Sequence, residues 1–257
     1  MEKLIKILLS SLFLLLSISC VHDKQELSST SDLNNQKGHL DNEGVNSKDY
    51  ESKKQSILSE LNQLLGQTIN SLQVAKHITD NLNVLDGENK VVETVISAVN
   101  LISSAASQVK GATKNMHDLA QMAEIDLEKI KKSSDKAILA SNVAKEAYNL
   151  NKAAEQNMRK LYKEQEEQLK TQKAEPDSNE IRQTKADVEI AWKSTVKAKD
   201  GLIDVENAIK EALDKIKTET TNNTKLADIK EVAELTLQIA KNAKEIAQEV
   251  ATLLNNT

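Results

Sequence analysis

The strongest pattern in the sequence lies near its C-terminal end, where mostly apolar residues repeat every seven positions in three adjacent rows. The rows are Leu226, Ala233, Ala240, Ala247 and Leu254; Ile229, Thr236, Ala243 and Val250; and Val232, Ile239, Ile246 and Leu253. Seven residues are close to two helical turns, and three rows make a stripe wider than the seam of a two-stranded coiled coil. We therefore expect a long helix that packs against several others. A dimer seam is the alternative use of this stripe.

The composition predicts long helices for the rest of the chain as well. Only one Pro and six Gly occur among 257 residues, and aromatic residues make up 2%. Few turn formers and few aromatic residues are typical of long helical proteins. The net charge of −5 lacks the basic excess of a nucleic-acid-binding surface, so nucleic acid is not expected as a partner. The single cysteine excludes disulfides within the chain.

Four further runs carry apolar residues three and four positions apart, which is the period of an amphipathic helix. They begin near residues 56, 91, 138 and 178. The residues expected in their cores include Ile57, Leu61, Leu64, Val99, Ile102, Val109, Met116, Leu119, Ile130, Ile138, Ala144, Leu161, Val188, Trp192, Leu202, Val205, Ile209 and Ile216. Whether residues 88–173 form one helix or two stays open, with Ser133-Ser134-Asp135 as a possible new helix start.

Breaks between the runs are expected at three places. Asp86-Gly87 suits the end of a helix, because Gly adopts a left-handed C-terminal cap. Pro176, the only proline, disfavours helix at the residue before it. Residues 218–224 read as a polar loop. The predicted fold class is all-α: an elongated, mostly antiparallel bundle of long helices with coiled-coil-like packing, spanning residues 55–257.

The N-terminal end has the layout of a lipoprotein signal peptide. Lys3 and Lys6 precede an apolar run too short to span a bilayer permanently, and Ser17 and Ser19 stand just before Cys20. We expect residues 1–19 to be removed and Cys20 to carry acyl chains, palmitate among them, that anchor the protein to a membrane. An ordinary signal peptide with a chance cysteine is the alternative, since Ser17 stands where a lipobox usually has Leu.

Residues 20–54 read as the lipidated cysteine and a disordered tether. This segment is rich in Ser and Asn and carries only isolated leucines, so it has too little apolar surface to offset the entropy of ordering. Its simplest role is that of a spacer.

No pattern in the chain predicts catalysis, a metal site or a cofactor. His22 and His39 lie in the expected tether, and His77 and His117 have no second histidine at ligand spacing. Trp192, the only tryptophan, is expected as a core anchor between helices, with an exposed binding hot spot as the alternative. We predict a protein that is not an enzyme.

Two segments resemble a known family. They are Val21-His22-Asp23-Lys24-Gln25-Glu26-Leu27 and Lys114-Asn115-Met116-His117-Asp118-Leu119-Ala120-Gln121-Met122-Ala123-Glu124. With the signal segment and the overall length, they look like the outer surface protein D family of Borrelia surface lipoproteins. The resemblance implies a lipid anchor at Cys20 in the outer membrane of a spirochaete, with the protein facing the cell exterior. It also implies contact with vector or host surface molecules and with antibodies, and no ligand-binding residue transfers from it.

The expected function is therefore that of a surface adhesin or antigen. A structural lipoprotein that spaces the envelope and oligomerises through its helices is the main alternative, and a small-molecule carrier is a weaker one. Because the apolar stripes are used in the core, a binding surface is expected on charged faces and connecting segments. The polar stretch from Gln165 to Thr184 is the best candidate, with a solvated connector as its simplest reading.

Overall fold

The computed structural model describes residues 42–81, 88–125, 128–171, 178–218 and 225–256. By its contacts the chain divides into two compact units, Met1–Val45 and Asn46–Thr257. Only residues 42–45 of the first unit are described. The second unit contains the helices whose packing follows, and in its described residues there is no strand.

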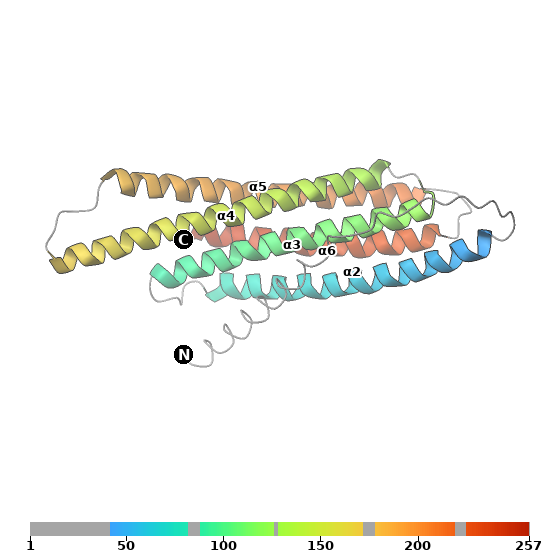
Figure 1. The fold of residues 1–257 in the computed structure, drawn as a ribbon, viewed down its shortest axis with the longest axis horizontal. Coiled ribbons are helices and arrows are strands. Elements are labelled where there is room, and N and C mark those ends of the chain that lie inside the picture. The colour runs from blue at the N-terminus through green and yellow to red at the C-terminus, as the bar shows by residue number, and fades with distance from the viewer. Residues whose placement is uncertain (1–41, 82–87, 126–127, 172–177, 219–224, 257) are drawn as a thin grey trace, which may run out of the picture. The chain divides into compact units, whose positions relative to one another are not determined.

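Five long helices make up the described residues, and they confirm the predicted all-α fold (Figure 1). Their bounds are α2 Asn42–Asn81, α3 Glu88–Met122, α4 Glu128–Thr171, α5 Ser178–Thr218 and α6 Leu226–Asn256. The start of α5 and the start of α6 agree with the sequence prediction. Asp86-Gly87, Pro176 and nearly all of the predicted 218–224 loop lie outside the described residues, as do residues 1–41 with the signal segment and Cys20.

Helices α3 to α6 form a closed ring of four. In chain order, α3 packs on α4, α4 on α5, α5 on α6, and α6 back on α3. Neighbouring helices in the ring run in opposite directions, as Figure 1 shows. The buried side chains of α6 include every member of the three heptad rows except Leu226 and Leu254, which are half-buried. The wide stripe is thus used inside the bundle, because α6 packs against α3 and α5 together.

Helix α2 lies against the side of the ring formed by α3 and α6. Gln108 Nε2 on α3 donates to Gln67 Oε1 at 3.2 Å, and Asn242 Nδ2 on α6 donates to Thr68 Oγ1 at 3.2 Å. Leu64 Cδ1 lies 3.7 Å from the position that a Cβ would take at Gly111. Helix α2 therefore contacts the ring through both polar and apolar side chains.

Helix α2 begins earlier in the chain than the sequence predicted. Residues 42–54 were expected in the tether, yet they are helical, and Tyr50 is only 2% exposed. Tyr50 and Lys54 stand seven residues before the core residues Ile57 and Leu61, so they continue the same helical rows. Polar neighbours concealed this continuation in the sequence.

The sequence also did not predict the position of the break between α3 and α4. Glu124 has a φ of 57°, Glu124 N–H donates to the Gln121 carbonyl, and Ile125 N–H donates to the Ala120 carbonyl. These paired bonds are the Schellman motif that ends many helices. Glycine usually takes the left-handed position, and here it is Glu124, so no glycine marked the site. Residues 88–173 therefore hold two helices, and Ser133 lies buried inside the second.

Small residues line the closest contact of the bundle, which joins α4 to α5. The buried residues there include Ala137, Ala140, Ala144, Ala147, Ala154, Ala191 and Ala198. A methyl group added at Gly201 would lie 3.4 Å from the Cβ of Ala140, which shows how close the two backbones come. Three larger residues predicted for the core, Ile138, Val188 and Trp192, are exposed instead. The alanine row, rather than the bulkier residues beside it, faces the partner helix.

Candidate interaction surface

An ion pair between α5 and α6 shows how far these two helices overlap. Lys244 Nζ lies 2.7 Å from a Glu206 carboxylate oxygen, and Lys210 Nζ lies 2.6 Å from the other oxygen. Burial by itself would raise the pKa of Glu206, but the hydrogen bonds from Lys210 and Lys244 outweigh burial and lower this pKa. The carboxylate is thus held ionised between two antiparallel helices.

This register leaves the first part of α5 without cover from α6. Asn256, where α6 ends, lies twelve residues beyond Lys244. In an antiparallel pair that end is level with about residue 194 of α5, twelve before Glu206. Figure 1 shows α4 and α5 extending past the C-terminal end of α6. We call α4 from Ala154 to Thr171 and α5 from Ser178 to Ser194 the hairpin end.

The hairpin end carries exposed apolar side chains. Trp192 is 38% exposed, and Val188 and Ile190 are exposed as well. Trp192 stands fourteen residues before Glu206, on the same heptad row, so it lies on the side of α5 that faces α6 further along. The prediction that Trp192 anchors the core is therefore wrong, because the helix that would cover this row has already ended.

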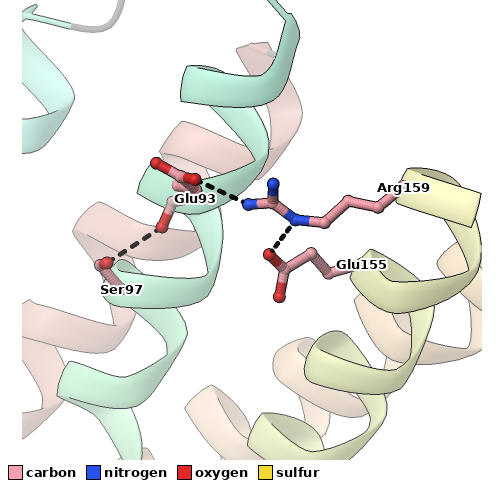
Figure 2. A network of polar contacts seen from close by, with 4 residues as sticks. All are labelled: Glu93, Ser97, Glu155 and Arg159. Atoms are coloured by element: carbon pink, nitrogen blue, oxygen red, sulfur yellow. Dashed lines mark hydrogen bonds and ion pairs between the residues drawn. The ribbon is translucent and has the colours of Figure 1, made fainter. Parts of the chain in front are cut away.

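A polar network ties the hairpin end to the start of α3 (Figure 2). Arg159 Nη2 donates to Glu93 Oε1 at 2.7 Å, and Arg159 Nε donates to Glu155 Oε1 at 2.7 Å. The hydrogen bond to Glu93, followed by the one to Glu155, raises the pKa of Arg159. On the opposite flank, Asn157 Nδ2 donates to Asp187 Oδ2 at 2.9 Å. Inside, Asn151 Nδ2 donates to Thr195 Oγ1 at 2.9 Å. The two helices are therefore held together along this stretch.

A second polar cluster joins the start of α2 to the start of α6. Tyr50 donates to Asp228 Oδ2 at 3.3 Å, and Lys54 Nζ lies 3.4 Å from Asp228 Oδ1. Lys225 Nζ lies 4.5 Å from the centre of the Tyr50 ring, within the range of a cation–π contact. Burial, reinforced by the charge of Asp228, raises the pKa of Tyr50. This cluster marks the end of the bundle opposite the hairpin end (Figure 1).

The other residues considered from the sequence show no catalytic arrangement. His77 is exposed beside Asn81 on α2, and His117 is half-buried beside Asp118 on α3. Across the described ranges, no group of three or more His, Cys, Asp or Glu residues is placed to hold a metal ion. Within the same ranges no helix has the length and apolar character to cross a membrane. Of the candidate segment 165–184, the structure describes the side chains of residues 181–184 only.

Comparison with known proteins identifies the family. The family model for Borrelia outer surface protein D (OspD) matches residues 1–253. The chain belongs to the OspD family. This confirms the resemblance seen in the sequence and makes the chain a member of a family of outer surface proteins. No curated protein and no solved structure matches the chain. The family assignment brings no ligand and no binding residue with it, so the surface described above has to be interpreted from its own chemistry.

Proposed function

We propose that this OspD-family chain is a non-catalytic surface lipoprotein that is anchored by acyl chains on Cys20 and binds vector or host surface molecules. The family supports an outer surface location, and Cys20 supplies the attachment point for acyl chains. Two or more acyl chains hold a protein on a membrane durably, whereas one holds it only marginally.

The observation that carries the binding role is the exposed apolar surface of the hairpin end. Trp192, the only tryptophan of the chain, stands partly exposed beside Val188 on paired helices that extend beyond α6. Tryptophan is strongly enriched among the residues that dominate binding energy at protein interfaces. In chain order, the segment with Cys20 precedes α2, and the hairpin end is formed by the later helices α4 and α5.

Two measurements test the anchor and the location. Mass spectrometry of the mature N-terminus should find acylated Cys20, and an unmodified Cys20 or cleavage elsewhere would contradict the lipid anchor. Protease added to intact cells should digest the protein. Protection of the chain until the outer membrane is opened would instead support a spacer inside the envelope.

The binding role itself is tested by a screen of the purified chain against surface extracts of vector and host tissues. We expect saturable binding to at least one extract. An absence of binding to every extract, with the chain folded as judged by circular dichroism, would contradict the adhesin role. Antibody recognition of intact cells tests the role as an antigen separately.

A further inference from the structure

One face of α5 continues the α5–α6 interface beyond the point where α6 ends. Lys185, Trp192 and Lys199 stand on the heptad row that continues into Glu206, the residue bound by Lys244 of α6. Ile181 and Val188 stand on the adjacent row, which continues into the buried residues Thr195, Leu202 and Ile209. We call the face made by Ile181, Lys185, Val188 and Trp192 the α5 end face. Val196 and Lys199 follow it, at the level of the last turns of α6.

The geometry of the α5 end face suits a helix. Further along α5, these two heptad rows pack against α6. This helix is antiparallel to α5 and presents mainly Ala, Val, Ile and Leu at seven-residue spacing. The uncovered part of α5, from Ser178 to about residue 194, is about 24 Å long at 1.5 Å per residue. Three to four turns of a second helix fit that length, and helices in grooves bind through apolar residues at such spacing.

The charged residues beside the α5 end face indicate what kind of helix it can bind. Lys185 stands seven residues before Trp192 on the uncovered part of α5, and Lys199 stands seven residues after it, where the end of α6 borders the face. The ion pair of Lys199 is a 3.8 Å contact with the neighbouring Asp200. The acidic residue nearest to Trp192, Glu189, is already bound by Lys193 at 2.6 Å. The face is therefore apolar with a basic residue at either end. Two copies of it would bring like charges together, which disfavours pairing between two copies of this chain.

We propose that the α5 end face binds an acidic amphipathic helix of a partner protein, laid along the path that α6 follows further along α5. This deepens the proposed adhesin function and rests on it, because it names the kind of structure on the partner that the hairpin end recognises. The apolar side of the partner helix covers Val188 and Trp192. Its Glu or Asp side chains pair with Lys185 and Lys199.

Trp192 is the only indole in the chain, so its fluorescence reports on this face alone. The probe is a synthetic two-heptad helix without Trp, which matches the length of the uncovered part, with Ala and Ile on one side and Glu on both flanks. Titrated into the purified full chain, it should shift the Trp192 emission to shorter wavelength in a saturable way, because the indole loses contact with water. Two control peptides, one with Lys in place of Glu and one with Ser in place of Ile, should leave the Trp192 emission unchanged.

Matched variants connect the signal to the charges of the face. The double variant Lys185→Glu, Lys199→Glu should weaken binding of the acidic peptide by about tenfold, as expected for two reversed pairs of roughly 0.7 kcal/mol each. It should also gain binding of the Lys peptide. The control double variant Lys145→Glu, Lys197→Glu changes exposed lysines outside this face and should leave both titrations unchanged. Circular dichroism verifies that each variant is folded.

Four results would overturn the proposal. The first is an acidic peptide that leaves the emission of Trp192 unchanged, and the second is equal binding of the Glu and Lys peptides. The third is an emission shift that phosphatidylglycerol vesicles produce but no peptide does. The fourth is an emission shift that appears when the chain alone is concentrated. Its failure is distinguishable from failure of the adhesin role. If a tissue extract binds the unaltered chain and the Lys185→Glu, Lys199→Glu chain equally, the adhesin role stands and this inference fails. If the acidic peptide binds but no extract does, the α5 end face binds an acidic helix and the adhesin role fails.

Discussion

Lys244 on α6 lies 2.7 Å from Glu206 on α5, and the Glu206 side chain is only 4% exposed. This pair joins the two helices and shows which residues of α5 and α6 lie at the same level. The exposure of Trp192 follows from it, because α6 ends before it reaches the level of that residue.

Replacing Lys244 with Met should destabilise the bundle. Glu206 would keep only Lys210 as a charged partner, and a buried carboxylate that loses one strong hydrogen bond costs about 1–3 kcal/mol. Denaturant unfolding of both chains measures the difference. Lys193→Met is the matched control, because Lys193 and Glu189 form an exposed pair of similar length, 2.6 Å, whose loss should cost at most about 0.5 kcal/mol. Equal losses in the two variants would contradict the role of burial.

The contribution of Glu206 should depend on pH. Its pKa in the folded chain lies below the ordinary value of about 4.3, so its contribution to stability is complete above that pH and is lost as pH falls through the folded pKa. The difference in unfolding free energy between the unaltered chain and Glu206→Gln should therefore be largest near neutral pH and shrink in acid. A difference that stays constant from neutral pH into acid would contradict the lowered pKa.

Glu124→Gly should stabilise the chain. Glu124 has a φ of 57°, and the left-handed conformation costs a residue with a side chain about 1 kcal/mol more than it costs Gly. We expect the melting temperature to rise by about 2–4 °C. Lys114→Gly, at an exposed position in the interior of α3, is the control and should lower it by a similar amount, since Gly weakens a helix interior by about 1 kcal/mol. A lower melting temperature for Glu124→Gly would count against the Schellman ending.

Tyr50 should be needed for the early start of α2. Tyr50→Ala removes a ring that is 2% exposed and should destabilise the chain by about 3 kcal/mol, as for other large-to-small changes in cores. Tyr50→Phe keeps the ring and loses only the 3.3 Å hydrogen bond to Asp228, which should cost about 1 kcal/mol or less. Hydrogen exchange of residues 46–54 locates the effect. Rapid exchange of these amides in the unaltered chain would show that the helix starts later.

The sequence predicted helices and their faces well where large apolar residues face several neighbours. In α6 the three heptad rows are buried as expected, because that helix packs against α3 and α5 at once. The prediction was wrong where α4 meets α5, since Ala140 and Gly201 form a close contact while the larger Ile138 and Trp192 are exposed. Periodicity weighted by side-chain size favours the bulky residue, and only the close approach of two backbones shows that alanine fits better.

The candidate surface depends on a relationship that no single helix encodes. Trp192 lies on the side of α5 that faces α6 further along the chain, and its exposure comes from the length of α6 together with the register seen at Lys244 and Glu206. Glu124 likewise ends α3 without the glycine that would have marked the site. The proposed lipid site at Cys20 rests on the sequence, because that residue lies outside the described ranges.

The central claim, that the hairpin end binds the partner, is tested most directly by removing that end and measuring binding to vector and host surface extracts. Asn151 and Thr195 are joined by a 2.9 Å hydrogen bond, so residues 152–194, which include Val188 and Trp192, can be replaced by a short Gly, Ser and Asn turn between them. Circular dichroism and melting should show the remaining bundle still folded. The account predicts that the shortened chain loses binding by about tenfold or more, equivalent to at least about 1.4 kcal/mol. A folded, shortened chain that binds as tightly as the full chain would contradict it.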